Sequence, residues 1–434
     1  MMTRKAGRWG AYARFGGSDS PPARRVLDHG RVLDSSTEPV IVEAVRTPIG
    51  RGHPEKGYYR HTHANELLGG CFRELLDRSG TDPAEVGDVL AGCVQQYGEQ
   101  SWNVARNAWL QAGLPVEVPA TTIDRQCGSA QQAVNFGATQ IAAGVEDAVI
   151  GSGVEHMGHV PLNVGFEWTD RVGTPYPPEL LAKHALVPQG ISAELMAAKW
   201  EIPRAELDEL SLRSHMLAAR ATEEGRFERE TMPMTVRMNG DSETVLTDQG
   251  IRANTTLERL SELRPAFPQA AEHLGGESNL KVTAGNSSQI SDGAAAVLLM
   301  SRGKAEQLGL RPRARIVDQV TVGVDPVLML SGPIPATRQL LERNGMTIDD
   351  IDLIEINEAF ASVVAAWRRE LDPDMERVNV NGGAIALGHP LGSTGARLMT
   401  TLLHELERQD REYGLVTMCC GGGFGTGTLI QRTS

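Results

Sequence analysis

Short apolar runs alternate with helical patterns in the first part of the chain. Strand-like runs lie at 39–44, 88–93 and 147–151, and helical patterns lie at 64–79 and 129–144. Gly80 follows the first helical pattern at the position of a C-cap. Short strands that alternate with helices predict parallel pairing in an α/β core.

The part of the sequence after residue 282 resumes this pattern and echoes the first part. Cys127 lies 38 residues after Val89, at a Gly-Ser turn that opens a helix. His389 lies 36 residues after Leu353, at a Pro-Leu-Gly-Ser turn that opens a helix over 396–409. The similar spacing predicts a duplicated α/β unit.

Two other stretches interrupt or precede this alternation. Residues 158–285 are richer in Pro, Glu and Arg and contain one clear helical pattern, 204–224, so they predict an inserted lid. Residues 1–37 have no strong apolar period and carry seven Arg and Lys against three Asp. They predict a disordered extension, with an organelle transit peptide as the alternative.

Composition excludes several classes of function. The net charge is −13, aromatic residues make up 5%, and no basic stripe suits a nucleic-acid backbone. No apolar run reaches the ~18 residues of a membrane span. The spacing of the five cysteines does not indicate a disulfide framework, which suits a reducing cytosol. The sequence contains no CxxC or HExxH motif, so no metal site is predicted.

The turn at Cys127 is the first candidate for chemistry. It lies between a strand and a helix, where unpaired N–H groups and the helix dipole favour an anion. This position predicts a lowered thiol pKa and a nucleophile. The alternative is a buried cysteine that packs as a small hydrophobe.

Three further candidates lie in the second part of the chain. His389, in a glycine-rich turn, is placed to act as a base or an oxyanion donor. Cys419 begins a glycine-rich run that ends at Gly427. Only seven residues follow this run, which is too few for the helix and second strand of a dinucleotide-binding unit. The run therefore predicts an oxyanion hole beside a proton donor and not a phosphate-binding loop. Asn357 orients a water or, as the simpler alternative, caps a helix.

Together these segments resemble the thiolases, the acetyl-CoA C-acyltransferases. The matching motifs are Cys-Gly-Ser at 127–129, Asn-Glu-Ala-Phe at 357–360, Gly-His-Pro at 388–390, Cys-x-Gly-Gly-Gly at 419–423 and a CoA-binding loop at 285–296. The sequences around Cys127 and Ser288 are similar to those of actinobacterial thiolases of fatty-acid and steroid breakdown. The resemblance implies an α/β thiolase fold of two similar halves, 38–157 and 286–434, each a mixed sheet flanked by helices, with the lid at 158–285 inserted between them.

The resemblance also implies the role of each site residue. Cys127 becomes acylated, His389 takes its proton, Asn357 holds a water, and Cys419 exchanges protons with acetyl-CoA and CoA. The N–H groups of Cys127 and Gly421 stabilise the oxyanion. Ser288 contacts the pantetheine arm of CoA, and Arg252 lies near its nucleotide end.

The family pattern further implies a 3-ketoacyl-CoA thiolase with CoA as substrate, no permanently bound cofactor, a cytoplasmic location, and a homodimer or homotetramer. Alternatives are an acetoacetyl-CoA thiolase and a non-catalytic partner that binds lipid or CoA; Cys419 speaks against a decarboxylating ketoacyl synthase. The lid has Gln189-Gly-Ile-Ser-Ala-Glu where many members have Met-Gly-x-Thr-x-Glu, and Ser287, Gln289 and Ser291 also depart from the pattern. These differences favour a degradative enzyme with a bulky or longer substrate.

Overall fold

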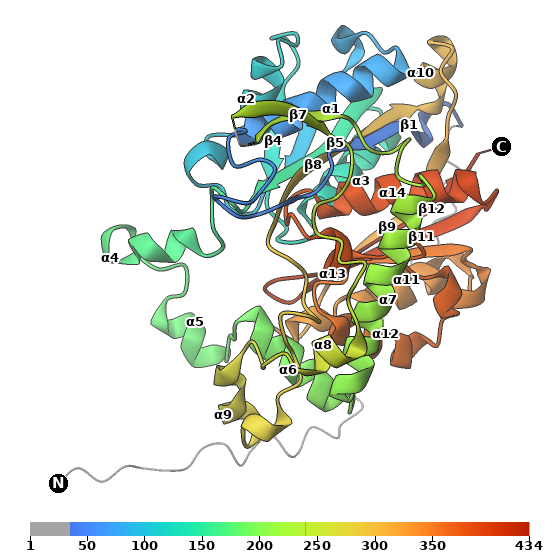
Figure 1. Cartoon of the computed structure of the whole chain (residues 1–434). Coiled ribbons are helices and arrows are strands. Elements are labelled where there is room, and N and C mark those ends of the chain that lie inside the picture. The colour runs from blue at the N-terminus through green and yellow to red at the C-terminus, as the bar shows by residue number, and fades with distance from the viewer. Residues whose placement is uncertain (1–34, 239, 434) are drawn as a thin grey trace. The chain divides into compact units, whose positions relative to one another are not determined.

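A ten-stranded mixed sheet organises the residues that the computed structural model describes, 35–238 and 240–433 (Figure 1). Its order is β10-β11-β12-β9-β1-β8-β5-β3-β4, with β2 paired to β8. The strands are β1 (Pro39–Arg46), β2 (Gly50–Arg51), β3 (Asp88–Gly92), β4 (Ala120–Ile123), β5 (Ala148–His156), β8 (Ser291–Ser301), β9 (Ala314–Gly323), β10 (Leu353–Ile356), β11 (Tyr413–Cys420) and β12 (Phe424–Arg432).

The sheet contains the same arrangement of strands twice. In the first repeat β3 is parallel to β5, and β8 and β1 continue antiparallel. In the second, β10 is parallel to β11, and β12 and β9 continue antiparallel. The predicted duplication is therefore confirmed. The sheet is mixed, as the family resemblance implies: the parallel pairing that the alternation predicts occurs at β3–β4, β3–β5 and β10–β11, and the other strand pairs are antiparallel.

The two repeats meet along one strand pair and one helix pair. Val40 and Ile41 of β1 pair with Arg315 and Ala314 of β9. Helix α3 (Ser129–Ala142) of the first repeat packs against α14 (Thr394–Arg408) of the second. A Cβ atom at Gly395 would lie 2.3 Å from the backbone nitrogen of Gln131, so only glycine lets these helices approach so closely.

Helix α1 (Ala64–Ser79) shows how local sequence sets the helix boundaries. The His63 ring accepts a hydrogen bond from the Asn65 N–H, and Glu66 returns a contact to the N-cap backbone. Gly80 ends the helix with φ 69°, a left-handed conformation that glycine adopts without strain. The boundaries and the C-cap are those predicted.

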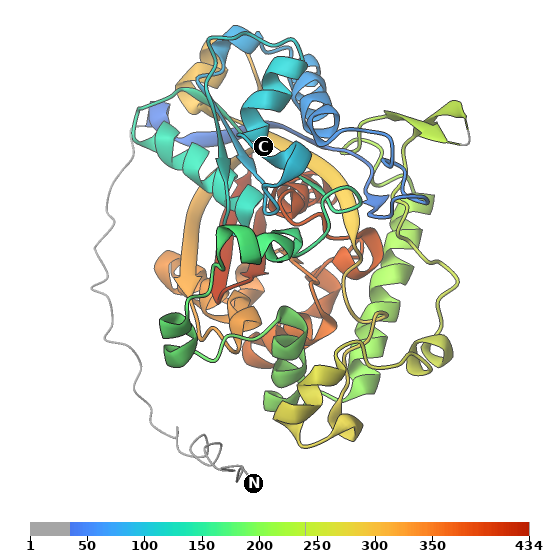
Figure 2. The ribbon, with the colours of Figure 1, turned by 90° about the vertical axis from the view of Figure 1, so that its left-hand side faces the viewer.

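The lid contains both helices and a small hairpin and packs against both repeats, since the hairpin residues Met234, Val236 and Val245 belong to the hydrophobic core of the first repeat. In Figure 2 its green and yellow segments lie beside the orange and red strands and helices, and α6 and α7 both contact α12 (Ala361–Leu371). The lid elements are α4 (Thr169–Val172), α5 (Pro178–Lys183), α6 (Gln189–Lys199), α7 (Arg204–Glu223), β6 (Met234–Met238), β7 (Asp241–Val245), α8 (Leu257–Ser261) and α9 (Ala271–Leu274).

The first strand after the lid belongs to the first repeat. β8 lies between β1 and β5, whereas the sequence assigned everything from residue 286 onward to the second half. All eleven residues of β8 are buried, so the alternation that would mark a half-exposed strand is missing. The remaining helices are α2 (Val104–Gln111), α10 (Arg302–Gln307), α11 (Pro333–Asn344) and α13 (Ala384–Leu387).

Residues 1–34 of the predicted disordered extension lie outside the described residues. Its last three residues, Ser35–Thr37, form a 3-10 turn that contacts α10. None of the described helices combines the length and apolar composition that crossing a bilayer requires.

Candidate active site

Cys127 lies in a constrained turn between β4 and α3. Gln126 has φ 50°, a left-handed conformation that costs a non-glycine residue ~1–3 kcal/mol. The Ser129 hydroxyl donates to the Gln126 carbonyl at 2.6 Å and accepts from the Arg125 N–H at 2.9 Å. A Cβ atom at Gly128 would lie 2.7 Å from Sγ of Cys420, so the turn needs glycine there.

The Cys127 thiol is protonated at neutral pH, which corrects the predicted lowering of its pKa. Burial raises the pKa of this thiol to about 11, although hydrogen bonds from the Gly421 N–H, the Gln189 side chain and its own N–H oppose the rise. The side chain is only 2% exposed, and this burial depends on the tertiary structure and not on the local turn. The thiol therefore needs a base.

His389 carries its proton on Nδ1, which leaves Nε2 unprotonated and able to act as that base. Nδ1 lies 2.6 Å from Oγ1 of Thr394, and this hydroxyl donates its own hydrogen to the Pro390 carbonyl at 2.8 Å. The hydroxyl can therefore only accept from Nδ1–H. Burial and the nearby Arg397 lower the pKa of His389 to about 3, so the ring is neutral at physiological pH.

Asn357 follows β10 and lies beside this ring. Its Nδ2 donates to Nε2 of His389 at 3.3 Å. Its Oδ1 is buried and accepts no hydrogen bond from the described residues. A buried amide oxygen of this kind is available to a water or to a polar group of a substrate.

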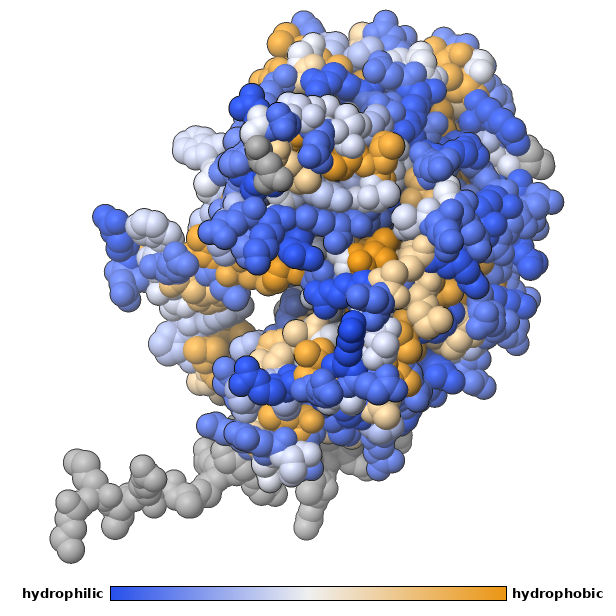
Figure 3. Space-filling model, in the orientation of Figure 1, coloured by the Kyte–Doolittle hydropathy of each residue, from blue (hydrophilic) through white to orange (hydrophobic). Residues whose placement is uncertain are grey.

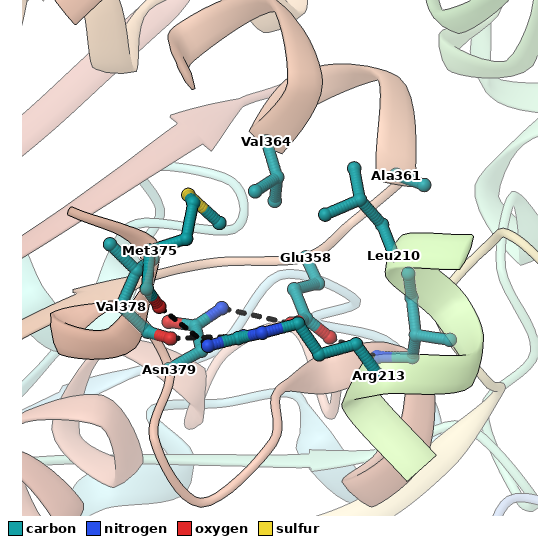
Figure 4. A pocket seen from close by; sticks show the side chains of 9 residues that line it. Leu210, Arg213, Glu358, Ala361, Val364, Met375, Val378 and Asn379 are labelled. Carbon is teal, nitrogen blue, oxygen red and sulfur yellow. Dashed lines mark hydrogen bonds between the residues drawn. The ribbon is translucent and has the colours of Figure 1, made fainter. Parts of the chain in front are cut away.

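Glu358 holds the segments that carry Asn357 and His389. Its carboxylate accepts from the Ser214 hydroxyl at 2.6 Å and the Ile385 N–H at 3.2 Å. It also accepts from the Asn379 amide at 2.9 Å, as Figure 4 shows. Ile385 lies in α13, just before His389. The second residue of the Asn-Glu-Ala-Phe motif therefore fixes the distance between two site loops.

Cys419 and Gly421 lie at the end of β11 and in the turn that follows. Burial raises the pKa of Cys419 well above its ordinary value, and the charge of Cys127 acts on it, so the two sulfurs interact. Gly422 and Gly423, with φ 83° and 88°, turn the chain into β12. The Cys420 side chain packs beneath the Cys127 turn, against Gly128.

Ser288 lies on a loop that contacts the Asn357 loop. Its N–H donates to the Ala359 carbonyl at 2.9 Å. The neighbouring Gln289 amide donates to the carbonyls of Gly250 and Ile385, both at 2.9 Å. The predicted CoA loop is thus tied to the segment before Arg252 and to the one before His389.

Arg252 lies close to a second arginine that the sequence reading missed. The charge of Arg51 lowers the pKa of Arg252, in addition to the effect of burial. The Arg51 N–H donates to Oε1 of Gln249 at 2.9 Å, which holds β2 against the 249–252 segment. Among the described residues neither guanidinium has a carboxylate partner, so together they can bind an anion.

Glu99, His156 and His159 form a group of ligand-type side chains that the sequence reading also missed; their ligand atoms lie within 4.8 Å of one another. Nδ1 of His159 lies 3.1 Å from Oε1 of Glu99, and its Nε2 lies 3.0 Å from the Arg60 carbonyl. Each ring nitrogen of His159 thus faces an oxygen atom of the chain. Nε2 of His156 lies 3.0 Å from the Tyr59 carbonyl, and its Nδ1 lies 3.2 Å from the His159 N–H. The ring nitrogens of both histidines therefore already have partners within the described chain.

Two family models match almost the whole described chain. The thiolase N-terminal domain matches residues 39–303, and the thiolase C-terminal domain matches residues 310–432. The boundary between them falls after β8, in agreement with the sheet.

Curated relatives align over most of the chain. A Mycobacterium tuberculosis protein named steroid 3-ketoacyl-CoA thiolase FadA6 is 45% identical over 91% of this chain and 94% of its own length. A Vibrio vulnificus 3-ketoacyl-CoA thiolase is 45% identical over 91% of this chain and 99% of its own length.

Solved structures give the same result. The human mitochondrial 3-ketoacyl-CoA thiolase superposes with a TM-score of 0.82 at 35% identity, covering 92% of this chain and 100% of the human chain. The Bacillus anthracis acetyl-CoA acetyltransferase superposes with a TM-score of 0.82 at 39% identity, covering 91% of this chain and 99% of the other.

Proposed function

The chain belongs to the thiolase family of acyltransferases, and we propose that it cleaves 3-ketoacyl-CoA with CoA through an acyl-enzyme on Cys127. The observation that carries this proposal is the neutral His389, whose unprotonated Nε2 lies beside Asn357 of the Asn-Glu-Ala-Phe motif. A buried thiol with a raised pKa and a buried neutral imidazole form a nucleophile and base pair.

In the first half of the reaction the Cys127 proton moves to Nε2 of His389. The thiolate sulfur bonds to the 3-keto carbon, and the C2–C3 bond breaks. The electron pair passes to the departing acetyl-CoA enolate, whose C2 takes the proton of Cys419. Nε2–H of His389 and a water on Asn357 stabilise the enolate oxygen, and the Cys127 and Gly421 N–H groups stabilise the tetrahedral oxyanion.

In the second half CoA replaces the enzyme sulfur. The Cys419 thiolate takes the proton of the CoA thiol, whose sulfur then attacks the acyl carbon. The bond to the Cys127 sulfur breaks, and that sulfur recovers its proton from His389. Both cysteines and His389 end in their starting protonation states, because the proton that Cys419 gives to acetyl-CoA is replaced by the proton of the CoA thiol. The cycle therefore needs no permanently bound cofactor.

CoA is placed by the segments around Ser288 and Arg252. Ser288 would contact the pantetheine arm, because its loop lies on the Asn357 loop. Arg252 and Arg51 would bind the phosphates of the nucleotide end, because neither has a carboxylate partner in the described part of the chain.

The preferred acyl group is longer or bulkier than acetyl. The lid exposes apolar side chains along 162–181, seen in orange around α4 and α5 in Figure 3; they include Phe166, Trp168 and Val172, the last 79% exposed. This stretch packs at Gly165 against Tyr97. The Tyr97 loop is joined through the Glu155 carboxylate to Gly392, three residues from His389.

We also propose that the enzyme is a cytoplasmic homo-oligomer. The described cysteines are all free, as expected in a reducing compartment. Strand β4 ends the sheet, and Trp102, 91% exposed, and Val116, 64% exposed, lie near it in the chain. Light scattering tests the assembly, and a monomer at working concentration contradicts it.

The test of function is turnover of 3-ketoacyl-CoA of short, long and steroid side-chain type, followed by loss of the ketoacyl absorbance. We expect cleavage, with higher kcat/KM for the larger acyl groups. Preference for acetoacetyl-CoA would indicate the acetoacetyl-specific alternative. CoA binding without turnover of any acyl group would indicate a non-catalytic binding protein.

A matched variant tests the nucleophile. Cys127→Ser should abolish acylation and retain CoA binding, since a hydroxyl is a much weaker nucleophile and leaving group than a thiol. Unaltered turnover in this variant would contradict the assignment of Cys127.

A further inference from the structure

The carboxylate of Glu155 is bonded to the turn that follows His389, and the catalytic scheme above does not use it. Glu155 lies near the end of β5 and is fully buried. Its Oε2 accepts from the Gly392 N–H at 2.8 Å. Gly392 lies between His389 and Thr394, the residue that sets the tautomer of the ring, so a shift of this turn disturbs the bond at Nδ1.

The other partners of this carboxylate are also N–H groups. Oε2 accepts from the Val94 N–H at 3.0 Å, and Oε1 accepts from the Gln95 N–H at 2.9 Å and from the Gln100 side-chain amide at 3.1 Å. Burial raises the pKa of Glu155, and these four hydrogen bonds oppose the rise. Because all four partners are donors, the ionised carboxylate is the form that satisfies them. Hydrogen bonds to a charged acceptor are stronger than neutral ones, so the bond to Gly392 holds the turn firmly.

The same turn packs against the first repeat through glycines. A Cβ atom at Gly153 of β5 would overlap with the Gly392 carbonyl oxygen, and one at Gly92 of β3 would lie 2.5 Å from it. The Cβ atom at Gly92 would also overlap with the backbone nitrogen of Ala130, in the first turn of α3. The helix that follows the nucleophile and the turn that follows the imidazole therefore rest on the same strand ends.

We propose that Glu155 is a positioning residue for the reaction, whose carboxylate holds the His389 turn in the alignment with Cys127 that proton transfer requires. This inference rests on the proposed function, because it concerns how the base meets the nucleophile. Proton transfer needs donor and acceptor within hydrogen-bonding reach, and a misplacement of ~1 Å can lower a rate ~100-fold.

The main variant is Glu155→Gln, which keeps the shape of the side chain. In either orientation its NH2 group faces two N–H donors, so two hydrogen bonds are lost and the remaining two become neutral. Hydrogen exchange followed by peptide mass spectrometry should show exchange at 391–393 and 94–95 at least ~10-fold faster than in wild type. We expect kcat per folded protein to fall ~10–100-fold, with the KM for CoA unchanged.

Glu194→Gln is the matched control. The Glu194 carboxylate is also buried and accepts from the N–H groups of Lys281 and Val282 at 2.8 Å each, but it lies in α6 of the lid. This variant should speed hydrogen exchange at 281–282 and keep kcat close to wild type. A fall in kcat equal to that of Glu155→Gln would overturn the proposal, because the loss of any buried carboxylate would then have the same effect.

Gly392→Ala tests the same contact without changing the carboxylate. A Cβ atom at Gly392 would lie 2.8 Å from Oε2 of Glu155 and 2.5 Å from the Val154 carbonyl oxygen, so it pushes the turn away. We expect the same fall in kcat at unchanged KM, and little further loss in the double variant, because both changes act through one contact. Fully additive losses, or loss of the folded state in both single variants, would overturn the proposal.

The exchange measurement distinguishes this inference from the proposed function, because it requires no turnover. If the wild-type protein cleaves no 3-ketoacyl-CoA but Glu155→Gln speeds exchange at 391–393, the function fails and the hold on the turn stands. If the wild type is active and Glu155→Gln leaves either the exchange or kcat unchanged, the function stands and the inference fails.

Discussion

At the scale of single residues, the proton on His389 decides what the site can do. The ring is directed by Thr394, whose hydroxyl has already given its hydrogen to Pro390. A base with its lone pair toward the site follows from these two contacts alone. The sequence identified His389, but its tautomer depends on a partner five residues away in the next helix.

Thr394→Val tests this dependence. Valine has nearly the same shape but no acceptor, so the Nδ1–H bond is lost and the ring is free to take the other tautomer. We expect kcat/KM for thiolysis to fall ~10–100-fold, the usual range for losing a residue that orients a reactive histidine. Thr394→Ser keeps the hydroxyl and should remain close to wild type; equal losses in both variants would argue against the tautomer.

The buried His404 predicts a pH effect on stability. Burial and Arg313 lower its pKa to about 3, whereas an unfolded histidine has a pKa near ~6.5. The unfolded chain therefore takes up a proton in this range that the folded chain does not, so the contribution to stability falls as the pH drops below ~6.5. At pH 5 this loss is about 2 kcal/mol.

The measurement compares urea unfolding at pH 7 and pH 5 for wild type and His404→Gln, which keeps a donor for the Thr400 carbonyl. We expect the variant to lose about 2 kcal/mol less on acidification than wild type. Using the difference between the two proteins removes the opposite effect of buried carboxyls such as Glu355, whose pKa burial raises to about 8. Equal losses in the two proteins would show that His404 titrates normally.

At the scale of elements, the crossing of α3 and α14 sets the geometry of the site, because Cys127 precedes one helix and His389 precedes the other. The crossing depends on Gly395, because a side chain at this position would clash with the backbone of Gln131. Gly395→Ala should cost about 1–3 kcal/mol in the free energy of unfolding. It should also reduce turnover, since the helices must move apart.

Gly323→Ala is the matched control for that variant, because nothing lies within 4 Å of a Cβ atom at that position. Urea unfolding and initial rates are measured for both. A stable and fully active Gly395→Ala protein would show that the two helices can separate without affecting the site.

Elements whose boundaries are set by local sequence were predicted correctly, and elements placed by long-range contacts were not. Helix α1 was predicted to the residue, because its cap signals lie within the segment itself. The place of strand β8 was not predicted, because a fully buried strand lacks alternation and its position is set by pairing with β1 and β5. Arg51 was missed for a related reason, since its position beside Arg252 depends on a contact between segments far apart in the chain.

At the scale of the whole molecule, the charge distribution matters for CoA. The chain has a net charge of −13 and must bind a substrate that is itself anionic. We propose that Arg51 and Arg252 supply the local positive charge that binds the phosphates of CoA. Because β2 and the 249–252 segment each supply one arginine, this proposed site requires β2 to pack on that segment.

Replacing both arginines tests this role. Arg51→Gln with Arg252→Gln should raise the KM for CoA roughly 10–100-fold, as expected when two charge-assisted contacts are lost, and leave kcat nearly unchanged. Arg259→Gln is the control, because its guanidinium donates to the Asn254 carbonyl on a neighbouring loop. An unchanged KM in the double variant would place the phosphates elsewhere.

The seam where β1 pairs with β9 has an evolutionary consequence. The thiol comes from the repeat on one side of this seam and the imidazole from the repeat on the other. A half-length ancestor would therefore have reached this chemistry only by joining two copies edge to edge. Within one chain each repeat can then differ from the other, and here the first carries Cys127 whereas the second carries His389.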